Sequence, residues 1–82
     1  MMKFFDVADF LRKRGYCEYD IKENTRVFYE YERLDFLHEE CAKKFEVEYG
    51  NGEVKKIIMA QYWFGKTAFK NITTLDELYE SV

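Results

Sequence analysis

Hydrophobic and polar positions alternate on both sides of the dipeptide Asn51-Gly52. Before it, Phe45, Val47 and Tyr49 alternate with glutamates, which is the pattern of a half-buried strand. After it comes a long run of β-branched, aromatic and lysine residues that also favours a strand. Asn-Gly is typical of a type I′ turn, because both central residues of that turn need positive φ. The pattern therefore predicts a β-hairpin with a two-residue loop.

A two-residue loop also determines which residues of the two strands face each other. The predicted pairs are Tyr49 with Val54, Val47 with Lys56, Phe45 with Ile58 and, on the other face, Glu48 with Lys55. In this register Ile58 belongs to the core, so we expect its replacement by alanine to destabilise the fold.

The first part of the chain predicts a helix followed by another hairpin. Residues 4–14 place apolar side chains three and four positions apart and end in basic residues before Gly15, as at the C-terminus of a helix. Residues 16–21 and 26–34 both alternate apolar with charged positions. The polar residues 23–25 between them suit a turn, so these two segments are predicted to pair.

Residues 36–44 are compatible with either a helix or a strand. A helix would form two ion pairs in the favourable i,i+4 orientation, Glu39 with Lys43 and Glu40 with Lys44. A strand would have a poor alternation of apolar and polar positions. The helix is the favoured interpretation.

The end of the chain predicts a short helix. Gly65 is expected to end the strand that follows the Asn-Gly turn. Thr74 and Glu77 have the spacing of a capping box, and Leu75 and Leu78 begin an apolar stripe behind it. We expect this helix to pack against the sheet.

These segments predict one α+β domain over residues 1–82, with the element order α-β-β-α-β-β-α. Its four-stranded antiparallel sheet would have helices on one face. The sheet residues expected in the core are Val27, Tyr29, Phe45, Val47, Tyr49, Val54 and Ile58.

The composition is that of a small, charged and aromatic-rich chain. Of its 82 residues, 35% are charged and 20% are aromatic. The formal net charge of −3 is unevenly distributed, because acids predominate in residues 18–53 whereas residues 54–70 carry four lysines and no acid. Such a patchwork favours a protein partner over a general attraction to nucleic-acid phosphates.

The N-terminal sequence and the two cysteines indicate a cytoplasmic protein, in the host cytoplasm if the chain is viral. The chain starts with a charged segment and has no apolar run of membrane-spanning length. In a reducing compartment, Cys17 and Cys41 are expected to be free thiols in the core rather than a disulfide.

Catalytic and metal-binding patterns are weak. Residues 60–67 approach the phosphate-binding loop pattern, but the first glycine is missing and the intervening residues are bulky strand formers. His38 is the only histidine, and with Cys41 three positions later it supplies at most half of a metal site. We therefore expect no enzyme activity, no cofactor and no bound metal.

One candidate binding surface is an acidic sheet face. Its six residues alternate with apolar positions in the predicted strands: Glu18, Asp20, Glu30, Glu32, Glu46 and Glu48. Like charges side by side in a sheet are destabilising unless a cation intervenes. The face is either a solvated surface or a mimic of nucleic-acid phosphates that occupies a basic groove on a partner protein.

The other candidate surface is the aromatic and basic end of the last predicted strand. Trp63, Lys66 and Lys70 are its predicted binding residues, with Phe69 nearby. An exposed Trp63 would suit a protein interface, or it would stack on a base while the lysines contact phosphates. The remaining alternative is that the terminal helix covers the whole cluster.

These observations predict a small non-enzymatic protein-binding module, an inhibitor or adaptor that occludes its partner's surface. In general profile, though in no motif, the chain resembles small phage- or virus-encoded inhibitors, including anti-CRISPR proteins. If the acidic face mimics nucleic-acid phosphates, the partner is a nucleic-acid-handling protein with a basic groove. The alternative is a single-stranded nucleic-acid-binding domain that uses Trp63 and the flanking lysines.

Overall fold

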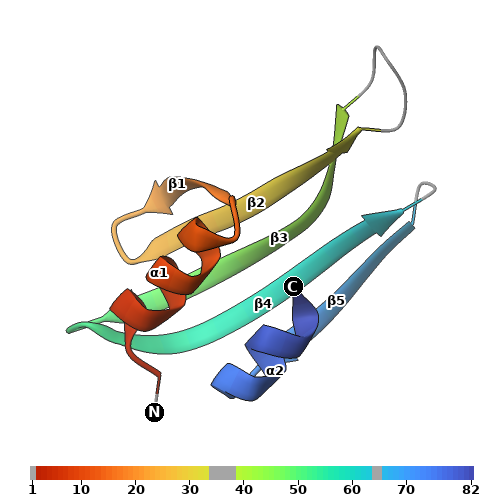
Figure 1. Cartoon of the computed structure of the whole chain (residues 1–82). Coiled ribbons are helices and arrows are strands. Elements are labelled where there is room, and N and C mark those ends of the chain that lie inside the picture. The colour runs from red at the N-terminus through yellow and green to blue at the C-terminus, as the bar shows by residue number, and fades with distance from the viewer. Residues whose placement is uncertain (1, 34–38, 64–65) are drawn as a thin grey trace.

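The computed structural model describes residues 2–33, 39–63 and 66–82, which form two helices and five strands. In chain order the elements are α1 (Phe4–Lys13), β1 (Cys17–Lys22), β2 (Thr25–Arg33), β3 (Glu39–Gly50), β4 (Glu53–Trp63), β5 (Lys66–Ile72) and α2 (Leu75–Ser81). The strands form one antiparallel sheet whose spatial order, β1-β2-β3-β4-β5, follows the chain (Figure 1). Every strand therefore pairs only with its neighbours in sequence.

Both helices lie over the same face of this sheet (Figure 1). Val7, Ala8 and Leu11 of α1 and Leu78 of α2 are buried in one apolar cluster. The sheet and the segment before it contribute the rest of that cluster: Tyr16, Phe28, Phe45, Val47, Val54, Ile57, Met59 and Ile72. Since every member of the cluster is more than nine-tenths buried, this layer between helices and sheet is the hydrophobic core.

The predicted fold of four strands and three helices is wrong, because residues 39–44 belong to strand β3 rather than to a helix. The rest of the segment, residues 34–38, lies outside the described residues. Ion pairs at i,i+4 contribute only about 0.2–0.5 kcal/mol each to a helix. In the sheet, Lys43 and Lys44 lie between two neighbours, pairing with β2 on one side and β4 on the other. Tertiary pairing outweighs the local preference.

The sequence does not predict strand β5, because apolar and polar residues do not alternate along it. All of its side chains except Ile72 are exposed, so there is no period-2 apolar pattern to recognise. Its pairing with β4 runs from Trp63 opposite Lys66 to Ile57 opposite Ile72. The observed order is therefore α-β-β-β-β-β-α, with β5 as an exposed edge.

The Asn-Gly turn is confirmed. Asn51 and Gly52 have φ values of 54° and 76°, as a type I′ turn requires, and Tyr49 is opposite Val54 as predicted. Beyond that pair the predicted register is wrong, because the pairing then jumps from Val54 to Lys56 and leaves Lys55 as a β-bulge.

The bulge moves the next residues of β4 to the opposite faces. Val47 lies opposite Ile57 and Phe45 opposite Met59, so Ile57 and Met59 are in the core. Ile58, the predicted core residue, is on the other face and is only partly buried. A one-residue shift exchanges the two faces because successive strand side chains alternate.

The two helices are confirmed, with local contacts that hold each in place. The first residue of α1 contacts the Asn-Gly hairpin, where the Phe4 amide donates to the Gly52 carbonyl at 2.9 Å. At α2, the Glu77 amide donates to the Thr74 hydroxyl at 3.1 Å, which is one half of the predicted capping box. The Glu77 carboxylate instead accepts from the Thr73 hydroxyl at 2.6 Å.

Candidate functional site

The face of the sheet opposite the helices, here called the open face, carries two central cross-strand rows of side chains. The first row runs from β1 to β5 through Tyr19, Val27, Glu46, Ile58 and Asn71. The second row runs through Cys17, Tyr29, Lys44, Ala60 and Phe69. Val27 and Ala60 are buried but do not belong to the cluster beneath the helices, as expected for the opposite face.

Aromatic side chains gather on the β1–β2 side of the open face. The Tyr29 ring lies edge-on to both Tyr19 and Tyr31, with ring centroids 5.5 Å and 5.3 Å away. Tyr19 and Tyr31 are largely exposed, and so is Phe69 on the β5 side of the same face. Exposed aromatic residues near one another are typical of an interaction surface.

Lys44 lies in the middle of the open face, on the central strand. Partial burial by itself lowers the pKa of Lys44, but a hydrogen bond to Tyr62 and the nearby Tyr19 and Glu46 leave that pKa raised. Lys44 is therefore an ammonium ion at neutral pH. Because Glu46 is the next residue on this face of β3, the centre of the open face carries one positive and one negative charge side by side.

The predicted acidic surface is divided between the two faces. Glu46 and Glu48 are on the open face, whereas Glu18, Asp20 and Glu30 are on the face of the helices. The side chain of Glu32 is outside the described part of the structure. The division follows from the register of β2 and β3, which pairs Phe28 with Phe45 and Val27 with Glu46.

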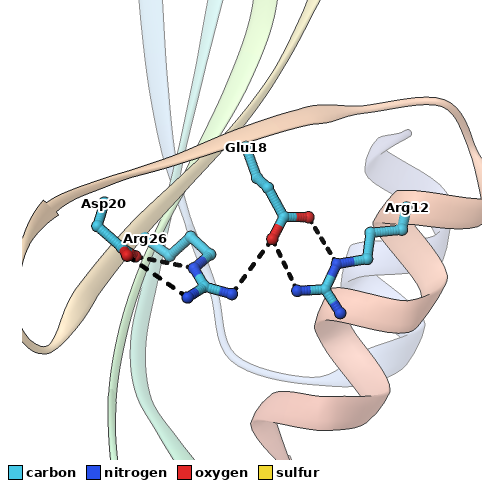
Figure 2. A network of polar contacts seen from close by, with 4 residues as sticks. All are labelled: Arg12, Glu18, Asp20 and Arg26. Atoms are coloured by element: carbon cyan, nitrogen blue, oxygen red, sulfur yellow. Dashed lines mark hydrogen bonds and ion pairs between the residues drawn. The ribbon is translucent and has the colours of Figure 1, made fainter.

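Two of the acids on the helix side belong to an ion-pair network (Figure 2). Arg12 of α1 donates two hydrogen bonds to the Glu18 carboxylate, at 2.6 and 2.7 Å. Arg26 of β2 donates to Glu18 at 3.2 Å and to Asp20 at 2.8 Å. Glu18 thus lies between two guanidinium groups, and its charge and that of Asp20 are compensated within the chain.

The third acid on that side, Glu30, also interacts within the chain. Burial raises the pKa of the Tyr16 phenol, and the charge of Glu30 and a hydrogen bond to it raise that pKa further. Tyr16 is therefore neutral at all physiological pH values, and its phenol interacts with the Glu30 carboxylate. Three of the six predicted acids thus interact with other residues of the chain on the helix side of the sheet.

The Glu18 network predicts an acid-dependent loss of stability. The hydrogen bond from Arg12 lowers the pKa of Glu18, so this carboxylate stabilises the fold above its unfolded pKa. That stabilisation is lost as the pH falls through the lower folded-state pKa. Glu18→Gln should therefore be less stable than wild type at neutral pH, and the difference should shrink as the pH falls below about 4. Urea unfolding at a series of pH values measures this, and a difference that is constant with pH would contradict it.

In the predicted aromatic and basic cluster, the two lysines share one face of β5 and are separated from Phe69. Lys66 and Lys70 pair with Trp63 and Met59, so both lysines point to the helix side of β5, whereas Phe69 points to the open face. Whether the Trp63 indole is exposed lies outside what the structure describes. The lysines and Phe69 therefore do not form one surface.

The described residues give no support for metal chemistry or for a membrane span. Within residues 2–33, 39–63 and 66–82, no group of three or more His, Cys, Asp or Glu side chains is close enough to hold a metal ion. His38 falls outside these ranges. Cys17 is an exposed free thiol, so its predicted place in the core is wrong. In the same ranges, neither helix has the length and apolar character needed to cross a membrane.

Tyr19, Tyr31 and Phe69 are exposed on the same face of the sheet, but neither of the two surfaces predicted from the sequence contains all three. The sequence contains one signal for this face, the three consecutive apolar residues Val27, Phe28 and Tyr29, since a strand with three in a row must place apolar groups on both faces.

Comparisons with models of protein families, with curated proteins and with solved structures found no match for the chain.

Proposed function

We propose that the chain is a non-enzymatic protein-binding module that docks a partner protein on the open face of its sheet. The observation that carries this proposal is that exposed aromatic residues lie on the sheet face that the helices leave uncovered, two on its β1–β2 side and one on β5. Tyr19, Tyr31 and Phe69 supply large, rigid contact areas, which are common among the residues that dominate binding energies. An inhibitor or adaptor of this kind acts by covering its partner's surface and needs no catalytic group.

The charges of the open face favour a protein over a nucleic acid. Among the described side chains of β3 and β4, Lys44 and Lys56 share this face with Glu46 and Glu48, so the formal charges of these two strands balance there. Single-stranded nucleic acids bind where aromatic rings and a positive groove coincide. The acidic-mimic version of the function is supported by Glu46 and Glu48 alone, since the described acids on the other face interact within the chain.

Two phenylalanines with the same exposure provide a matched test. Phe69 on the open face and Phe5 on α1 are both 71% exposed. Phe69→Glu should weaken capture of the partner from a lysate of the source organism by roughly tenfold or more, because a carboxylate would be buried without a pairing group. Phe5→Glu should leave capture unchanged. Quantitative mass spectrometry of the retained proteins measures both.

The same experiment separates the alternatives. Equal capture by wild type, Phe5→Glu and Phe69→Glu would refute docking on the open face, provided that circular dichroism shows each variant folded. Fluorescence anisotropy with labelled single-stranded DNA and RNA should show no saturable binding at physiological salt. Tight binding of either oligonucleotide that Phe69→Glu abolishes would assign the face to a nucleic acid instead.

A further inference from the structure

We propose that the protein docked on the open face is a second copy of this chain, packed face to face about a two-fold axis. The axis lies between the two sheets, at right angles to the strands, and passes between the first and second rows. This inference rests on the proposed function, because it names the partner of the same surface. Two sheets packed in this way place their inner side chains in contact at a separation of about 10 Å.

The heights of the side chains in the two rows are complementary under this rotation. The rotation lays the first row of one copy on the second row of the other. Along β2, Val27 is only 1% exposed and lies low, whereas Tyr29 stands higher beside it. Along β4 the order is reversed, since Ile58 stands higher and Ala60 is 2% exposed. Each tall side chain therefore faces a low one, as close packing requires.

One position further out, the pattern continues along β2. The same axis pairs Thr25 of one copy with the partner subunit's Tyr31. Thr25 is buried on the open face, and its hydroxyl has no hydrogen-bond partner among the described residues. Tyr31 is 56% exposed, so a tall polar aromatic side chain again lies over a low residue.

The charges on the central strand select this axis over the other two-fold axis of a face-to-face pair. Lys44 and Glu46 are adjacent on the open face of β3. With the axis at right angles to the strands, each Lys44 lies over the partner subunit's Glu46, and two interchain ion pairs form. With the axis parallel to the strands and centred on β3, Lys44 would lie over the partner subunit's Lys44, and like charges close together are strongly unfavourable.

A charge-swap series tests the inference on the purified full chain by sedimentation velocity at several protein concentrations. Wild type should form a dimer. Lys44→Glu and Glu46→Lys should each weaken dimerisation by roughly tenfold or more, because each places like charges against each other. The double variant Lys44→Glu/Glu46→Lys should restore the dimer, because the swap is symmetric in a self-complementary interface. Lys70→Glu, an exposed lysine on the helix side of β5, is the control and should dimerise like wild type.

The outcomes separate this inference from the proposed function. A wild-type chain that stays monomeric overturns the second copy as partner, and the proposed function still stands if capture from the lysate depends on Phe69. A dimer that neither single variant weakens overturns docking through Lys44 and Glu46. Loss of the dimer in both single variants without recovery in the folded double variant overturns the two-fold arrangement. Circular dichroism spectra establish that each variant is folded.

Discussion

Phe28→Ala is expected to lower the free energy of unfolding by about 3–5 kcal/mol, the usual loss for a buried phenylalanine. Phe28 is fully buried between β2 and the helices and lies beside the ring of Phe4. A domain of 82 residues has a total stability of about 4–12 kcal/mol, so the variant should be close to unfolding at room temperature.

Urea denaturation followed by circular dichroism measures this loss. Phe5→Ala is the matched control, because Phe5 is exposed on α1 and its truncation should change the stability by no more than about 0.5 kcal/mol. If the two variants unfolded at the same urea concentration, Phe28 would not be in the core and the register of β2 would be wrong.

Ile57→Ala should destabilise the chain by about 2–5 kcal/mol, and Ile58→Ala by clearly less. The two isoleucines are adjacent in β4, yet Ile57 is 1% exposed in the core and Ile58 is partly exposed on the open face. The comparison is best made at a protein concentration where the chain is monomeric, since Ile58 would also be buried by a second copy.

This pair of variants is a direct test of the β-bulge at Lys55. Without the bulge, Ile58 would lie opposite Phe45 in the core and Ile57 would be on the other face. Thermal unfolding of the two variants decides between the registers. A larger loss for Ile58→Ala than for Ile57→Ala would restore the register expected from the sequence.

The parts of the fold that could be predicted are those with a local cause. Asn and Gly adopt positive φ more readily than other residues, so the dipeptide Asn51-Gly52 is enough to predict the turn. The Thr74 cap and the apolar stripe of residues 4–13 depend on spacings of three and four residues, which the sequence displays directly.

The parts that could not be predicted depend on residues far apart in sequence. Nothing near Lys55 marks it as a bulge, because its position follows from the pairing of the whole of β3 with β4. Strand β5 is polar along its length and is held by β4 rather than by its own pattern. The predicted acidic surface was wrong for the same reason. Alternation alone placed Glu18 and Glu46 on one face, whereas the strand pairing places them on opposite faces of the sheet.

The pairing of each strand with its sequence neighbours makes most of the contacts in this fold local, which favours rapid formation of the sheet. Helix α1 is the exception, because its entry segment bonds to Gly52 and Val54, about fifty residues later. During synthesis on a ribosome, α1 is therefore made well before the β3–β4 hairpin against which it packs. A ten-residue helix is marginal by itself in water. Its apolar stripe consequently remains accessible to chaperones until β3 and β4 have emerged and paired.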